Sequence, residues 1–133
     1  MIVLSNTAAQ ILQPGQSIQF DNEVLHTGCG ECHRKNSSGV KLRAKGGIYS
    51  IHFSANAGGY AGAVQLSVQA SGMTLPETTM TTVPAAITDF MNVATATGYK
   101  NYCSESDVIT VTNTGANVVT VAPGSSLFIT RNA

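Results

Sequence analysis

Two cysteines and two histidines lie close together near residue 30, and their side chains are suited to binding a metal. His26, Cys29, Cys32 and His33 fall within eight positions. Thiolate and imidazole are ligands that zinc prefers, and Cys-x-x-Cys is the usual half of a small zinc site. Because Cys32 and His33 are adjacent, closing one tetrahedron around all four side chains is awkward, and sharing ligands between three copies of the chain would relieve that strain.

The same segment matches two other cysteine motifs, and neither chemistry fits. Residues 29–33, CGECH, have the pattern of c-type haem attachment. That reaction needs an export signal, and the first ten residues, MIVLSNTAAQ, have neither a basic region nor a long apolar core. A redox role needs a helix N-terminus to lower the pKa of a thiol, and no helix is expected here. We therefore favour a polar loop with reduced thiols and no cofactor, and zinc is the alternative.

The positive charges are segregated along the chain. Five of the seven basic residues occupy twelve positions: Arg34, Lys35, Lys41, Arg43 and Lys45. This cluster could dock on an acidic surface such as a capsid face, but the alternation of Lys41 and Arg43 with Val40 and Leu42 favours the solvated face of one strand. Nucleic acid is not expected as a partner, because acidic and basic residues balance at seven each and no aromatic residues interleave the cluster.

The remaining chemistry-bearing residues do not form an active site. No Gly-x-Ser-x-Gly motif occurs, and the carboxylates are scattered. Glu105 and Asp107 lie close together at the start of a strand, where charges keep an edge soluble. His52, on the polar face of a central strand, is interpreted as a structural histidine. Three histidines in all, two of them in one loop, are too few for a cupin-like metalloenzyme, so the sequence predicts a protein without catalysis.

Length and composition predict one domain, residues 1–133, with a weakly charged surface. The hydrophobic fraction of 43% is ordinary, but only 11% of the residues are charged, against about a quarter in typical domains. Neutral surface of this kind is available for contacts between subunits. No apolar run approaches the ~20 residues of a membrane span, so we expect the chain to be made and folded in a cytoplasm.

Residues 39–59 predict the centre of the fold. Val40 and Leu42 alternate with polar residues, and a glycine turn at 46–47 leads into a second strand. In that strand, residues 49, 51, 53 and 55 are apolar and the residues between them are polar. We expect a hairpin, with its second strand at the centre of a sheet.

Short strands with turns between them fill the rest of the chain. They are expected at residues 9–12, 17–20, 23–26, 64–70, 87–97, 107–113, 118–121 and 126–130. Regular spacing of this kind is typical of an antiparallel sandwich or jelly roll. The sequence therefore predicts an all-β jelly-roll sandwich.

Several segments, in order along the chain, carry a resemblance to a known family. They are LQPGQSIQF (12–20), CHR (32–34), SGVKL (38–42), GIYSIHF (47–53), VQLSVQASG (64–72), VPAA (83–86), DVITVTNTG (107–115) and SLFITRN (126–132). They resemble the complement/tumour-necrosis-factor-like jelly roll in its bacterial and phage branch. Within that branch the chain is similar to small head-fibre or capsid-decoration proteins of gut Firmicutes phages.

The resemblance implies a homotrimer that is part of a virion, with the major capsid protein or another virion component as its partner. Tyr49, Phe90 and Tyr99 are the candidates for the trimer interface. The collagen-like stalk that often precedes such domains is absent from this sequence, which favours direct docking on a particle or attachment through residues 1–8 as an N-terminal arm. The alternative function is a lectin-like adhesion domain that recognises host-surface glycans.

Overall fold

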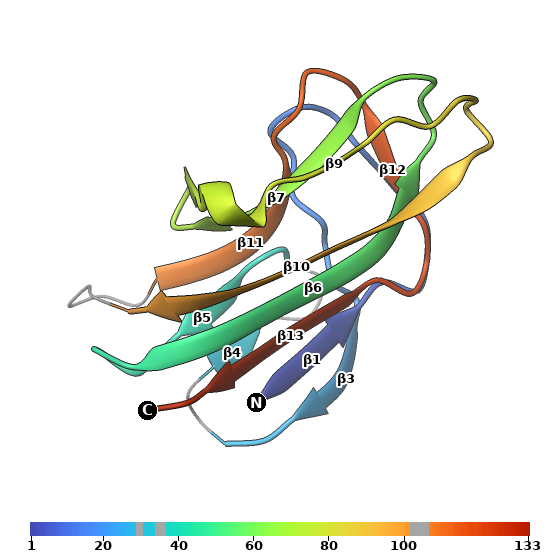
Figure 1. Cartoon of the computed structure of the whole chain (residues 1–133). Coiled ribbons are helices and arrows are strands. Elements are labelled where there is room, and N and C mark those ends of the chain that lie inside the picture. The colour runs from blue at the N-terminus through green and yellow to red at the C-terminus, as the bar shows by residue number, and fades with distance from the viewer. Residues whose placement is uncertain (29–30, 34–36, 102–106) are drawn as a thin grey trace.

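Two antiparallel sheets pack face to face in the computed structural model, which describes residues 1–28, 31–33, 37–101 and 107–133 (Figure 1). The strands of the larger sheet are β1 (Ile2–Ser5), β2 (Gln10–Leu12), β3 (Asn22–His26), β6 (Ile48–Gly58), β10 (Phe90–Lys100), β12 (Val119–Val121) and β13 (Ser126–Arg131). Those of the smaller sheet are β4 (Glu31–His33), β5 (Val40–Leu42), β7 (Val64–Ala70), β8 (Met73–Thr74), β9 (Met80–Thr82) and β11 (Asp107–Asn113).

The chain crosses repeatedly between the sheets, as in a jelly roll. After β1 to β3 it enters the smaller sheet for β4 and β5, returns for β6, and crosses again for β7 to β9. A single turn of 3-10 helix, η1 (Pro76–Thr78), lies between β8 and β9. The fold is thus the predicted all-β antiparallel jelly-roll sandwich. No helix in the described ranges is long and apolar enough to cross a membrane.

Strand β6 is the centre of the larger sheet, as its sequence predicts. Tyr49, Ile51 and Phe53 point into the core and are almost completely buried, followed by two buried alanines at 55 and 57. Burying such a row of side chains removes their apolar area from water and is the main source of stability available to a small domain. β7 and β11 of the facing sheet, and β13 beside β6, also contribute alternate residues to this core.

Strand β10 pairs with β6 along its whole length. The register runs without a break from Phe90 opposite Gly58 to Lys100 opposite Ile48. The other edge of β6 is shared, because β13 pairs with residues 49–54 and β12 with residues 57–58. β10 is therefore an edge strand of the larger sheet, and in Figure 1 it lies on the opposite side of β6 from β13.

The predicted hairpin between β5 and β6 is wrong, because the two strands belong to different sheets. β5 pairs with β4 and β11, whereas β6 pairs with β10, β12 and β13. The turn at Gly46, with φ of 72°, is the corner at which the chain crosses over. Alternation of apolar residues reveals which side chains face the core. Because both sheets of a sandwich face the same core, it does not reveal to which sheet a strand belongs.

Three further segments differ from expectation. Residues 17–20 form no strand. Ile18 and Phe20 are nevertheless fully buried, and their side chains pack into the core where the segment passes between the sheets. Part of the expected polar loop is β4, which pairs with β5. The strand expected at residues 87–97 begins later, at Phe90, and extends to Lys100.

The N-terminal residues are a core strand and not an attachment arm. β1 lies between β13 and β3, and Ile2 and Leu4 have no exposed surface. Asn6, which follows, is also buried, and its side chain binds the backbone of residues 8, 122 and 125. Residues 2–4 are a short run of three apolar residues in the sequence, and the alternation of buried and half-buried positions appears only in the structure.

Removing a β6 side chain tests its central place. We expect Ile51→Ala to lower the free energy of unfolding by about 3 kcal/mol, because it leaves a cavity between the sheets. Urea denaturation followed by circular dichroism measures the change. The control is Met73→Ala on β8, whose side chain is exposed and should change stability by less than about 0.5 kcal/mol. Equal effects of the two substitutions would contradict the assignment.

Candidate subunit interface and polar groove

The outer face of the larger sheet, turned away from the core, is almost uncharged. The registers place on it every second residue of β10 and β6, such as Ala96 opposite His52 and Ala94 opposite Ser54. On β13, Phe128 continues the row from His52, and Val3 of β1 continues it from Phe128. Among the described residues of this face, Lys100 at one end of β10 is the only lysine, arginine, aspartate or glutamate.

A shallow hollow lies in the middle of this face. It has a volume of about 400 Å³, and its floor and walls come from β6, β10 and β13. The rings of His52 and Phe128 meet edge to face there, with centroids 5.5 Å apart. Small side chains at Ser54, Ala94 and Ala96 leave the space open. An uncharged hollow of this kind can accept an apolar group from another molecule.

Several large apolar side chains are exposed elsewhere on this face. Leu25 on β3 is 41% exposed, and Ile48 and Phe90, on β6 and β10, are each 44% exposed. Their positions in the register place all three on the same outer face. Depletion of charge together with exposed aromatic and aliphatic side chains is the composition of the buried part of a protein interface.

The outer face of the smaller sheet has a different composition. Glutamine, serine and threonine side chains there bind one another: Gln65 Nε2 donates to Thr114 Oγ1 at 3.0 Å, and Gln69 Nε2 donates to Thr74 Oγ1 at 3.1 Å. Such groups are already satisfied on their own chain and remain compatible with water. The two outer faces therefore differ in kind, and the face of the larger sheet is the candidate interface.

The three residues expected at a trimer interface occupy different environments. Phe90 lies on the candidate interface. Tyr99 is partly buried on the core side of β10, and its hydroxyl donates to Asp107 Oδ2 at 2.7 Å. Tyr49 is fully buried, with its hydroxyl accepting a hydrogen bond from the backbone N–H of Ala44. A side chain with no exposed surface has none to offer a second chain, so Tyr49 belongs to the core.

Sequence reasoning missed Phe128, Leu25 and Ile48. A signal for Phe128 exists, because it stands between Leu127 and Ile129, which are buried. In a strand that alternates, a phenylalanine flanked by two core residues must point outward. The sequence can thus place its aromatic ring on an outer face, but the neighbours that make it part of one surface come from distant strands.

The candidate zinc ligands are only partly described. His26 has both ring nitrogens near acceptors, with Nε2 3.0 Å from the carbonyl oxygen of Glu31 and Nδ1 3.0 Å from Glu23 Oε1. His33 Nε2 lies 3.0 Å from the carbonyl oxygen of Ser37. Cys29 lies outside the described residues, and Cys32 is placed only as part of β4. Zinc binding by these four residues stays a sequence prediction.

Elsewhere in the described ranges no three histidine, cysteine, aspartate or glutamate side chains gather as a metal site. Of the expected acidic pair, Glu105 lies outside those ranges, and Asp107 is buried and not a solubilising edge charge. Arg34 and Lys35 of the basic cluster also lie outside them. Lys41 and Arg43 are exposed, as predicted for one face of a strand.

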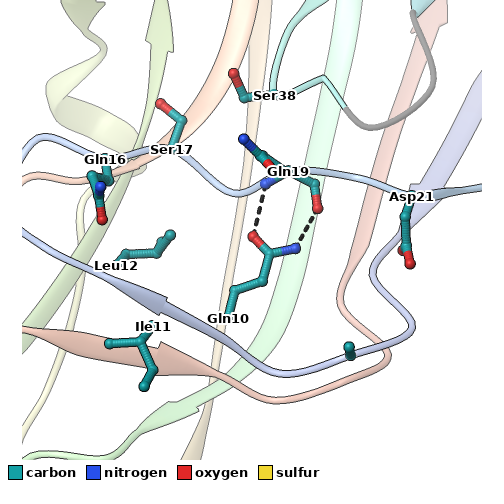
Figure 2. A pocket seen from close by; sticks show the side chains of 9 residues that line it. Gln10, Ile11, Leu12, Gln16, Ser17, Gln19, Asp21 and Ser38 are labelled. Atoms are coloured by element: carbon teal, nitrogen blue, oxygen red, sulfur yellow. Dashed lines mark hydrogen bonds between the residues drawn. The ribbon is translucent and has the colours of Figure 1, made fainter.

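A second hollow, the polar groove, lies between β2 and the segment that follows it. Its volume is about 610 Å³, and Figure 2 shows the side chains that line it. The lining residues are Ala8, Gln10, Ile11, Leu12, Gln16, Ser17, Gln19, Asp21 and Ser38. Gln10 points across the groove, where its side-chain amide forms hydrogen bonds to both the backbone N–H and the carbonyl of Gln19. The groove thus contains amide and hydroxyl groups and no aromatic ring.

Comparison with solved structures identifies the fold. Murine APRIL at pH 8.0 matches with a TM-score of 0.68 and 18% sequence identity over 98% of each chain. The globular domain of the zebrafish complement 1qA protein matches with a TM-score of 0.65 and 11% identity, again over 98% of each chain. PRD1 vertex protein P5 gives a TM-score of 0.49 at 14% identity, covering 92% of this chain and 97% of that one, and adds nothing to the fold assignment.

No family model and no curated protein sequence matches the chain. The likeness is therefore one of fold: the chain has the sandwich of the tumour-necrosis-factor-like and complement 1q-like domains. This confirms the fold expected from the sequence resemblance, at identities too low to transfer a function.

The hydrogen bond between Tyr99 and Asp107 joins β10 of the larger sheet to β11 of the smaller sheet. Asp107 is 5% exposed and also accepts a hydrogen bond from Ser71 Oγ at 3.1 Å. We expect Tyr99→Phe to lower the free energy of unfolding by about 2 kcal/mol, because a buried carboxylate loses a donor. Thermal unfolding measures it. The control is Tyr60→Phe, whose hydroxyl makes no hydrogen bond among the described residues; equal losses would count against the bridge.

Proposed function

We propose that this chain is a structural protein of a bacteriophage virion, without catalytic activity, and that it assembles as a homotrimer through the outer face of its larger sheet. The observation that carries the assembly is the contrast between the two outer faces. One face is a hydrogen-bonded polar surface, whereas the other combines a nearly complete lack of charge with the exposed side chains of Leu25, Ile48 and Phe90.

The position of β10 is compatible with a cyclic assembly. Its outer edge has no strand partner among the described residues, and it lies beside the candidate interface. A contact that joins one surface of a subunit to a different surface of the next closes into a cyclic oligomer when the rotation allows it. That the oligomer has three subunits is taken from the sequence resemblance.

The absence of catalysis is supported by how the polar side chains are used. Asp107 is engaged by Tyr99 and Ser71, and Ser17 and Thr112 bind each other at 2.7 Å. The ring of His52 packs edge to face against Phe128, and among the described residues it makes no hydrogen bond to a hydroxyl or a carboxylate. The described residues therefore suit packing and binding more than acid–base chemistry.

The virion context is supported by the sequence resemblance to head-fibre and capsid-decoration proteins. A decoration protein has to stay folded on the outside of a particle, and a sandwich with a continuous buried core is consistent with that requirement.

Placing a charge in the hollow tests the assembly. We expect the protein to have the mass of a trimer by light scattering and Ala96→Lys to have the mass of a monomer, because burying three unpaired ammonium groups close together is costly. Ala116→Lys is the matched control, since Ala116 is exposed in the turn before β12 beside the smaller sheet. A wild-type monomer, or a trimer in the Ala96→Lys variant, would overturn the proposed interface.

The virion assignment has a separate test. Mass spectrometry of purified particles of a phage that encodes this chain should detect it, and antibody labelling should place it on the particle surface. Particles that lack the chain while the infected cell contains it would contradict a structural role in the virion, whatever the oligomeric state.

A further inference from the structure

We propose that the polar groove beside β2 is a binding site for a neutral saccharide. Its volume, about 610 Å³, lies in the range of small-molecule sites. Of its lining residues only Asp21 is charged, and the others offer amides, hydroxyls and aliphatic groups (Figure 2). Sugars present hydroxyl groups that both donate and accept hydrogen bonds, together with apolar C–H faces.

The groove is held in shape before any ligand arrives. Gln10 fixes the backbone of Gln19 through both atoms of its amide. Gln16 Oε1 accepts a hydrogen bond from the backbone N–H of Gln13 at 2.8 Å. At the far end, Asp21 accepts hydrogen bonds from the backbone N–H and the hydroxyl of Thr7. Such preorganisation reduces the entropy lost on binding.

Three polar groups remain available to a ligand. The side-chain amide of Gln19, Nε2 of Gln16 and the hydroxyl of Ser38 make no hydrogen bond to another described residue. Two of them come from the segment after β2 and the third from the segment before β5, and all three line one hollow. Together they supply donors and acceptors without a formal charge, which is the chemistry needed to recognise hydroxyl groups.

The same contacts argue against other ligand classes. An anionic ligand would meet the carboxylate of Asp21 and no lysine or arginine among the lining residues. An extended peptide that paired with the segment after β2 would find the backbone groups of Gln19 already bound by Gln10, which leaves only the edge of the three-residue strand β2. The exposed side chain of Ile11, with Ala8 nearby, offers an aliphatic surface for the C–H face of a sugar ring.

Binding at the groove does not require the trimer. Of the lining residues, only Ile11 also lies on the outer face of the larger sheet. The monomeric Ala96→Lys variant should therefore bind sugar as the wild-type protein does. The saccharide proposal can fail while the assembly holds, and the reverse is also true.

The experiment is a set of NMR titrations of the isotope-labelled full chain with glucose, galactose, N-acetylglucosamine and rhamnose, and with glucuronate as the charged comparison. We expect at least one neutral sugar to shift the amide signals of residues 10–21 and the side-chain amide of Gln19, and glucuronate to shift none of them. Shifts confined to other parts of the chain, or none with any neutral sugar, would overturn the proposal.

Two variants locate the site. Gln19→Ala removes a free amide and should weaken binding about fivefold, as expected for the loss of a neutral hydrogen bond. Ala8→Trp should fill the groove and abolish binding, whereas Ala116→Trp, the same change in an exposed turn, should leave the affinity unchanged. Unaltered binding in Ala8→Trp would place the sugar elsewhere and refute the site.

Discussion

The structure depends on one strand, β6, which pairs with three neighbouring strands and also packs its inward side chains into the core. β6 has two edges and one inward face: β10 takes one edge completely, and β12 and β13 divide the other. Its inward face carries Tyr49, Ile51 and Phe53 against the opposite sheet. Since β10 pairs with β6 in an unbroken register and β13 sets the position of β1, the placement of most of the larger sheet follows from this strand.

The repeated crossing between sheets has a cost that buried asparagines offset. Each crossing leaves backbone groups at the ends of strands, where the ladders stop and water is excluded. Asn113 Nδ2 donates to the carbonyls of Leu12 and Asn117, at 3.0 and 2.9 Å, and Asn101 Nδ2 donates to those of Leu42 and Ala44, at 2.9 and 3.2 Å. With Asn6 at the start of the chain, these residues tie the corners of the sandwich together. Nothing in the sequence distinguishes these asparagines from the other asparagines of the chain.

Much of the fold could be predicted because alternation is a local property. β7 and β11 were expected at their observed bounds, and the inward residues of β6 were identified correctly. Strand partners are not local, which is why the hairpin between β5 and β6 was wrong and why β1 was taken for an arm. Apolar and polar residues alternate at positions 17–20 as they would in a strand. Here the alternation arises because Ile18 and Phe20 pack into the core from a segment that crosses between the sheets.

The candidate interface could not be predicted for the same physical reason. Its composition becomes visible only when the registers bring Phe128 beside His52 and Ala96, residues from three parts of the chain. The central strands bury every second residue, so their outward residues are the ones free to define how the protein meets other molecules. On the smaller sheet those residues bind one another, and on the larger sheet they are small, neutral or aromatic. That difference contributes nothing to the core, and it is the observation from which the proposed subunit interface is argued.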